Sequence, residues 1–294
     1  MYDFQSIYRA GSVEDAIGAL ARDPAAVVIA GGSDVLIKIR EGKLAGCRLV
    51  SIHGLTQLEG VTLDGQGTIH IGPLTTFRGV TCSPVIREHL PFLGEATDQA
   101  GGPQLRAVGT IGGNLCNGVT SADSASTMVA LDALLTLQGP EGKRQVPISQ
   151  WYQGVGKVAL KPGELLVDIE VPREQYEGWS GLYINYAQRN AMDIATLGVA
   201  CLVKLSPDKK RCDQVRLAFG VAAPVPSRAR TAEAGVAGLP VEQAIGRIGA
   251  LALEDVNPRT SWRASKEFRV QLVRELSGRA LRQAVRNGGG EPEC

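Results

Sequence analysis

Several features that would assign a protein class directly are missing from this sequence of 294 residues. It contains no apolar run of about 18 residues, so no membrane-spanning helix is expected. The formal net charge is only +1, whereas nucleic-acid-binding domains normally carry a basic excess, so no nucleic-acid partner is expected. The first residues lack the basic region and apolar core of a secretion signal, which favours the cytoplasm.

Cysteine and histidine are few and scattered. The six cysteines form no Cys-x-x-Cys pair, and the three histidines (His53, His70 and His89) include no pair four residues apart. Because clusters of these residues hold zinc and iron–sulfur centres, the chain is expected to bind no metal. Cys116 follows a glycine-rich motif, but a small thiol in that place is typical of a buried core residue.

What the sequence does contain is two short glycine-rich motifs about 80 residues apart. They are Ala30–Asp34 (AGGSD) and Thr110–Asn114 (TIGGN), and each is followed by a segment that can begin a helix. Glycine permits positive φ and close approach of a ligand, and N–H groups in such loops bind anionic oxygens. Neither motif is GxGxxG or GxxxxGK[ST], so Rossmann and P-loop readings are poor. Two such loops predict a long cofactor, bridged by a pyrophosphate and held from both sides.

A small polar segment, Ser121–Ser124, follows the second motif. It is expected to open a helix over residues 123–135, where its hydroxyl and N–H groups could contact a ligand. Asp123 could add a carboxylate to this contact, and a carboxylate is also favourable near the positive end of a helix dipole. The two roles of Asp123 are compatible.

Apolar periodicity and turn residues predict an α+β chain with two lobes. Residues 1–175 are expected to hold two α/β subdomains, about 1–55 and 56–175, and residues 176–286 a C-terminal lobe. The first lobe is predicted to contain a helix over Val13–Ala21 with Ser12 as N-cap, a hairpin around Asp64–Gly67 and a glycine-rich loop over residues 100–118. The tail 287–294 is expected to be disordered.

The C-terminal lobe is predicted to place three strands before three helices. The strands are Leu182–Gln188, Ala195–Lys204 and Gln214–Ala222, and the helices lie near Pro226–Ala234, Val241–Leu253 and Ser265–Ala284.

Taken together, the motifs resemble the FAD-binding (medium) subunits of the molybdenum hydroxylases, most closely those of bacterial xanthine dehydrogenases. The similarity covers nearly the whole chain, and the motifs stand in the family's order. The matching segments are Ala30–Leu36, Thr110–Asn114 with Asn117, Ser121–Ser124, Tyr186–Ile194, Phe219–Pro226 and Ser261–Arg269. The resemblance implies an FAD-binding domain of the p-cresol methylhydroxylase and vanillyl-alcohol oxidase type, made of two α/β subdomains. A C-terminal α+β lobe with a three-stranded sheet and helices follows it.

The same resemblance implies roles for individual residues. The segment 27–34 resembles the loop that wraps the pyrophosphate, and 109–114 resembles a second loop over the ribityl and phosphate region. Asp123 resembles a carboxylate at the cofactor, Leu165 begins a strand whose backbone meets the isoalloxazine, and Asn185 stands where some relatives carry a lysine near the flavin. The implied cofactor-binding set is Val27, Val28, Ile29, Ala30, Gly31, Gly32, Ser33, Asp34, Gly109, Thr110, Ile111, Gly112, Gly113, Asn114, Asp123, Leu165 and Asn185.

By resemblance, the chain binds FAD non-covalently and acts in an NAD-linked xanthine dehydrogenase. A large partner subunit with the molybdenum cofactor would hydroxylate the substrate, and a small subunit would pass electrons through [2Fe–2S] clusters to FAD. NAD⁺ would be the co-substrate, and the complex would be a heterotrimer or a dimer of heterotrimers. Arg189 and Asp193 match residues near the open face of the flavin; alternatively they form a surface ion pair.

Three other functions stay open at this stage. One is a stand-alone oxidase with the same FAD fold, which would need acid–base residues near the flavin. Another is a flavin subunit of the CO dehydrogenase or aldehyde oxidoreductase type, which uses a different electron acceptor. The third is an assembly protein that uses the fold as a docking scaffold. The four-cysteine cluster loop of the 4-hydroxybenzoyl-CoA reductase subunit is missing, which disfavours that relative.

Overall fold

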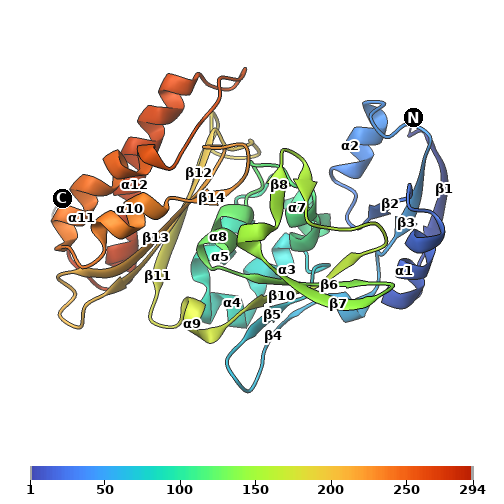
Figure 1. Ribbon diagram of the computed structural model, residues 1–294, viewed down its shortest axis with the longest axis horizontal. Helices are drawn as coiled ribbons and strands as arrows, with labels where there is room; N and C mark the ends of the chain where they lie inside the picture. Colours follow the sequence, from blue (N-terminus) through green and yellow to red (C-terminus); the bar gives the residue numbers. More distant parts are fainter. Residues whose placement is uncertain (1, 293–294) are drawn as a thin grey trace.

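The computed structural model describes residues 2–292 and shows three parts in a row (Figure 1). An N-terminal subdomain, a central subdomain and a C-terminal lobe follow one another along both the chain and the long axis. No helix within residues 2–292 is long and apolar enough to cross a bilayer. The α+β class predicted from the sequence is confirmed. The boundaries near residues 55 and 175 stay predictions.

The N-terminal subdomain is a parallel sheet in the order β1-β3-β2 with two helices. Its elements are β1 (Phe4–Arg9), α1 (Val13–Arg22), β2 (Val27–Ile29), α2 (Val35–Arg40) and β3 (Cys47–Ser51). Ser12 caps α1, because its hydroxyl accepts a hydrogen bond from the Asp15 N–H at 3.1 Å, as predicted. Strand β1 was not predicted, since all six of its residues are exposed and give no alternating pattern.

Replacing Ser12 with alanine is expected to lower the free energy of unfolding by about 1 kcal/mol, because the Asp15 N–H loses its acceptor. Urea unfolding followed by circular dichroism measures the change. Ser12→Asn is the matched control because asparagine keeps a capping oxygen. Equal losses in both variants would contradict the capping role.

The central subdomain packs short helices against one face of a five-stranded antiparallel sheet in the order β4-β5-β10-β6-β7. Its strands are β4 (Val61–Leu63), β5 (Ile69–Ile71), β6 (Leu134–Gly139), β7 (Gly142–Pro147) and β10 (Leu165–Val171), with a small hairpin of β8 (Tyr152–Gly154) and β9 (Lys157–Val158). Its helices are α3 (Phe77–Cys82), α4 (Pro84–His89), α5 (Pro91–Asp98), α6 (Pro103–Val108), α7 (Ile111–Cys116) and α8 (Ala125–Ala130), with 3₁₀ turns at Thr56–Leu58 and Ile148–Gln150. The predicted hairpin around residues 64–67 is confirmed.

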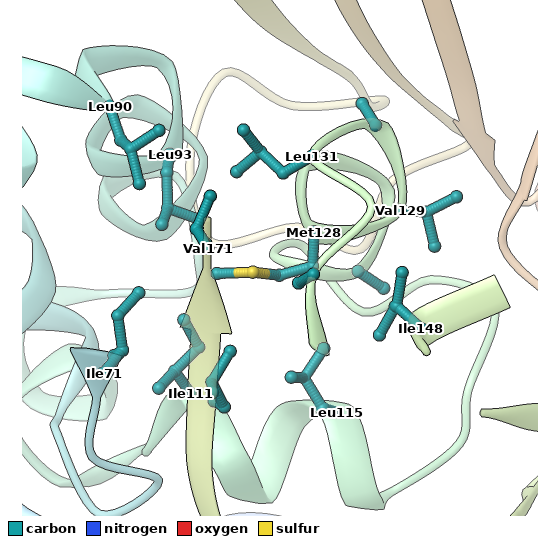
Figure 2. Close-up of a cluster of buried hydrophobic side chains, with 14 of the residues drawn as sticks. Ile71, Leu90, Leu93, Ile111, Leu115, Met128, Val129, Leu131, Ile148 and Val171 are labelled. Carbon is teal, nitrogen blue, oxygen red and sulfur yellow. The ribbon is translucent and has the colours of Figure 1, made fainter. Parts of the chain in front are cut away.

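The core of the central subdomain holds α7 and α8 against the sheet. Ile111 and Leu115 of α7 meet Met128 of α8 and Val171 of β10 (Figure 2). Alternation along the strands sends apolar side chains to this core and polar ones to the opposite face. The glycine motif that opens α7 is therefore fixed to a rigid core.

Two predictions for this region were wrong in extent. The glycine-rich stretch over residues 100–118 is not a continuous loop, because Pro103 starts α6 and the Thr110 hydroxyl caps α7. The helix predicted over residues 123–135 is shorter, since α8 covers only 125–130. Asp132 then takes a positive φ of 46°, and β6 begins at residue 134.

The C-terminal lobe is a four-stranded sheet, β11-β12-β13-β14, with helices on one face. Its elements are β11 (Ser180–Tyr186), β12 (Leu197–Leu205), β13 (Cys212–Gly220), β14 (Ser227–Arg228), α10 (Arg230–Val236), α11 (Val241–Leu251), a 3₁₀ turn (Ala252–Glu254) and α12 (Lys266–Asn287), preceded by α9 (Arg173–Tyr176). The three predicted strands are present. The predicted helix at 226–234 starts only at residue 230, because residues 227–228 pair with β13 as a fourth strand.

The sheet of the C-terminal lobe is covered on both faces. Val199 and Cys201 of β12 pack toward α10–α12, whereas Ala200 and Leu202 join the core of the central subdomain. This explains why seven successive residues of β12 are buried. The lobe is thereby fixed against the central subdomain.

The chain is ordered further toward its end than expected. Asn287 closes α12 and its side chain donates to the Gly181 carbonyl at 2.8 Å, and Gly290 is buried against Val285. The predicted disorder is therefore wrong for residues 287–292, which pack on the C-terminal lobe; residues 293–294 lie outside the described residues.

Candidate functional site

The two glycine motifs meet in space. A Cβ atom built on Gly31 would lie 1.8 Å from the carbonyl oxygen of Val108, next to Gly109. Only glycine permits this approach, so the first loop packs directly on the backbone that leads into the second. The motifs come from different subdomains, with α2 and α7 on their facing sides (Figure 1).

The first loop offers a set of free backbone donors. Gly32 has a positive φ of 74°, and the carbonyl groups of Gly32 and Asp34 accept the first hydrogen bonds of α2. Within residues 2–292, the N–H groups of Gly31 through Asp34 donate no hydrogen bond. Successive free N–H groups at such a turn form an anion-binding concavity, which fits a phosphate oxygen.

The N–H groups of the second loop were expected to bind a ligand, but those of its two glycines already donate within the protein. The Gly112 N–H donates to the Pro73 carbonyl at 2.9 Å, and the Gly113 N–H donates to the Thr110 hydroxyl at 3.1 Å. A Cβ on Gly112 would lie 2.6 Å from that Pro73 oxygen. These glycines serve the close packing of α7, and the first loop is the better phosphate cradle.

A lysine that the sequence analysis did not single out joins the two loops. Lys38 of α2 donates from Nζ to the Asn117 side-chain oxygen at 2.6 Å, across the junction of the two subdomains. Lys38 lies in the helix that follows the first glycine motif, and Asn117 caps the C-terminal end of the helix that contains the second. The sequence could have indicated Lys38 by its position, because it lies four residues after Asp34 on a predicted helix and hence on the same helix face.

Asp123 is buried between the second loop and the C-terminal sheet. Asn185 of β11 donates from Nδ2 to Asp123 Oδ1 at 3.2 Å, and Asn185 Oδ1 is buried without a partner among the described residues. Burial raises the pKa of Asp123 to about 7, although hydrogen bonds, including one from Tyr183, oppose the rise. An unpartnered carbonyl oxygen beside a destabilised carboxylate leaves acceptors for a polar ligand.

The raised pKa of Asp123 predicts a pH-dependent stability of the flavin-free chain. Because the folded-state pKa of about 7 exceeds the ordinary value of 3.8, the stabilisation is complete below about pH 4 and is lost as the pH rises through 7. The loss is at most about 1.4 kcal/mol per pH unit in that window. Urea unfolding from pH 4 to 8 measures it. Asp123→Asn should flatten the profile, and an unchanged slope in that variant would contradict the assignment.

The segment before Asp123 is anchored to the end of β13. The Val221 N–H donates to the Thr120 carbonyl and hydroxyl oxygens, both at 3.1 Å, and the Thr120 hydroxyl donates to the Ala223 carbonyl at 3.0 Å. Val221 has a φ of +68°, which is strained for a β-branched residue. Such strain clusters at functional sites, and here the hydrogen bonds of Thr120 hold the strained residue and the segment 120–124 together.

The other residues predicted to bind the cofactor lie in elements that lead into the loops or pack elsewhere. Residues 27–29 form β2, which leads into the first loop, and Gly109 ends α6 at the junction of the loops. Leu165 begins β10 and is buried in the cluster that holds the apolar side chains of α1.

Arg189 and Asp193 share the loop that follows β11. The Asp193 carboxylate accepts from the Arg189 N–H at 3.1 Å, and the two side chains lie 3.6 Å apart. The side chain of Met192, between them, packs on Gly102 of the central subdomain. The pair therefore shapes a loop that reaches from Asn185 toward α6.

A cavity of about 880 Å³ lies elsewhere, on the polar face of the five-stranded sheet. Its lining includes His70, whose Nδ1 is 2.6 Å from an Asp168 carboxylate oxygen, but no residue of either glycine motif. We place the candidate site at the glycine loops because the first loop holds the free N–H donors, and Ser124, next to Asp123, donates to the Asn114 side chain of the second motif.

Two family models match the chain. The FAD-binding domain of molybdopterin dehydrogenases matches residues 2–174, and the C-terminal domain of CO dehydrogenase flavoproteins matches residues 183–284. Together they span almost the whole chain in the order that the structure shows.

Individual relatives match over the same length. The xanthine dehydrogenase FAD-binding subunit of Escherichia coli O157:H7 is 42% identical over 292 residues, covering 99% of both chains. The nicotinate dehydrogenase FAD-subunit of Eubacterium barkeri is 31% identical over 82% of each. Among solved structures, CO dehydrogenase of Hydrogenophaga pseudoflava superposes with a TM-score of 0.92 at 26% identity, covering 98% of this chain and 99% of that one.

Proposed function

Because this chain belongs to the family of FAD-binding domains of molybdopterin dehydrogenases, we propose that it is the electron-transfer subunit of a xanthine dehydrogenase-like complex. We infer the substrate class from the 42% identity to a xanthine dehydrogenase subunit over essentially all of both chains. CO dehydrogenase medium chains match over nearly the same length at 26–30% identity. A flavin subunit of the CO dehydrogenase type, with a different electron acceptor, is therefore the weaker alternative.

The residues at the junction of the loops fit FAD. The free N–H groups of residues 31–34 would receive the pyrophosphate, and Lys38 would add a positive charge beside it. Asp123 would accept hydrogen bonds from cofactor hydroxyl groups, and the unpartnered oxygen of Asn185 would accept one more. All these contacts are non-covalent.

The chain's part in the reaction is to hold and orient the cofactor. The bound FAD would supply the redox chemistry, taking up electrons and giving them up as a hydride to NAD⁺. The loop with Arg189 and Asp193 would border the face used by the nicotinamide, because it follows β11 directly after Asn185. An exposed guanidinium there would attract the NAD⁺ pyrophosphate.

Substrate hydroxylation would fall to other chains. Within residues 2–292, no three Cys, His, Asp or Glu side chains are grouped to hold a metal ion. We assign the molybdenum cofactor to a large partner subunit and the [2Fe–2S] clusters to a small one, in a heterotrimer or a dimer of heterotrimers. Two of the matched relatives are called "FAD-subunit" and "medium chain", and both names fit one subunit of a larger complex.

Affinity purification from the native host, with metal and flavin analysis, tests this assignment. We expect two further chains to co-purify, one of them cysteine-rich, together with iron, molybdenum and FAD. After dissociation, the flavin should stay with this chain and the metals with the others. A chain that purifies alone with FAD and turns over its own substrate would be a stand-alone oxidase, and one without flavin would be a scaffold.

A further inference from the structure

A second polar cavity lies away from the glycine loops, where the central subdomain meets the C-terminal sheet. It has a volume of about 260 Å³, and its lining includes Asp132, Trp179, Arg216, Arg228 and Arg230. Three of these side chains are arginines from successive elements: β13, β14 and α10. Nothing in the proposed electron-transfer function uses them.

Arg216 is a half-buried cation that forms no ion pair among the described residues, although the charges of Asp132 and Glu233 act on it from farther away. Its guanidinium donates to the Gln175 side-chain oxygen at 2.6 Å and to the Ala130 carbonyl at 3.1 Å, and it stacks on Trp179 at 4.2 Å. No carboxylate lies within 4 Å of it among the described residues. Burial and then the charge of Arg228 lower the pKa of Arg216 to about 10, so it stays charged at neutral pH.

The neighbouring charges leave the cavity positive. Arg228 is paired with Glu233 at 2.7 Å and also with Asp132, and its side chain is only 8% exposed. Arg230 is 60% exposed and lies at a loose 3.5 Å from Asp132. Three guanidinium groups against two carboxylates leave a charge of +1.

Further donors at the same place are also unmatched. The Lys204 ammonium lies 5.2 Å from the Trp179 ring centre and has no ion pair within residues 2–292. The buried indole N–H of Trp179 has no acceptor there either. Lys204 does not line the cavity, but it adds a positive charge beside the Trp179 ring that does. Buried donors in native proteins normally have acceptors, so an excess of donors and positive charge indicates a missing anion.

We propose that this cavity binds a tetrahedral oxyanion of the phosphate or sulfate class. Such an ion offers oxygens in several directions, which suits guanidinium groups that converge from different elements, whereas a carboxylate presents one planar fork. Its negative charge complements the net positive charge of the arginine cluster. The volume equals that of about nine waters at roughly 30 Å³ each, enough for one hydrated ion and too little for a dinucleotide. Asp132 opposes binding, but its charge is engaged by Arg228.

The site would tie the lobes together. Arg216 and Arg228 belong to the C-terminal sheet, whereas Ala130, Asp132 and Gln175 precede it and belong to the central part of the chain. A bound oxyanion would add contacts between them, so it should raise the stability of the folded chain in proportion to its occupancy.

Calorimetric titration of the full-length chain with inorganic phosphate, at ionic strength held constant with sodium chloride, tests the site. With the chain loaded with FAD, so that the loop at residues 31–34 is occupied, we expect one saturable site and a melting temperature that rises with phosphate but not with chloride. Arg230→Gln, which removes an exposed side chain, should weaken phosphate binding about tenfold or more. Arg279→Gln on α12 removes the same charge from an arginine of similar exposure, 67% against 60%, and should leave binding unchanged.

Sulfate and succinate at the same ionic strength distinguish the ion class. Sulfate binding with weak succinate binding supports the proposal. No saturable phosphate binding, equal affinity in the Arg230→Gln and Arg279→Gln variants, or preference for succinate would overturn it. Flavin content and electron transfer are expected to be unchanged in Arg230→Gln, so this test is independent of the proposed function.

Discussion

Replacing Gly31 with alanine is expected to reduce FAD affinity by about fivefold to 150-fold. The new methyl carbon would lie 1.8 Å from the Val108 carbonyl oxygen, so the two loops must separate by more than about 1 Å. Overpacking of this kind costs about 1–3 kcal/mol, and the displaced N–H groups of residues 31–34 would no longer face the pyrophosphate together. Fluorescence titration of the flavin-free chain with FAD measures the affinity.

Gly65→Ala is the matched control for this variant. Gly65 has no atom within 4 Å of a built Cβ and no positive φ, so alanine fits there without strain. Far-UV circular dichroism should be unchanged in both variants, and FAD affinity should fall only in Gly31→Ala. Wild-type affinity in Gly31→Ala would mean that the contact between the loops is unrelated to the cofactor.

The isolated chain loaded with FAD is expected to reduce dyes with NADH but to leave xanthine untouched. Flavin and nicotinamide would meet on this chain, whereas hydroxylation needs the molybdenum subunit. Adding the partner subunits should restore xanthine-to-NAD⁺ turnover from a rate indistinguishable from zero. Steady-state assays of the chain and of the complex measure both reactions, and xanthine oxidation by the chain alone would overturn the subunit assignment.

Asp193→Ala refines this experiment. The Asp193 carboxylate holds the backbone of its loop through the Arg189 N–H, so its loss should disturb only the nicotinamide end. We expect the NAD⁺-linked rate to fall about tenfold or more, while xanthine still reduces the metal centres at the wild-type rate. Equal losses in both half-reactions would indicate a defect in folding or assembly.

The sequence predicted most of the regular elements because their signals are local. Helix α1 has an N-cap and helical spacing, and the long strands of the C-terminal lobe are continuous apolar runs. Strand β1 was not predicted because its exposed residues do not alternate. Helices α6 and α7 were not predicted because glycine is frequent around them. Short helices fixed by tertiary packing leave little trace in local propensity.

The candidate site was found through its motifs, but its chemistry required the structure. The sequence indicated two loops and Asp123, yet the different use of the N–H groups in the two loops depends on contacts with Pro73 and Val108, which are distant in the sequence. The bond between Lys38 and Asn117 spans 79 residues and has no sequence signature. Long-range contacts of this kind decide which glycine loop keeps free N–H groups and which one is used for packing.

Equilibrium titration of the flavin-free chain with FAD, followed by acid precipitation, tests the central claim most directly. We expect one tight site per chain and complete release of the flavin into the acid supernatant, because every proposed contact is non-covalent. Absence of a saturable FAD site, or a yellow precipitate that retains the flavin, would contradict the account.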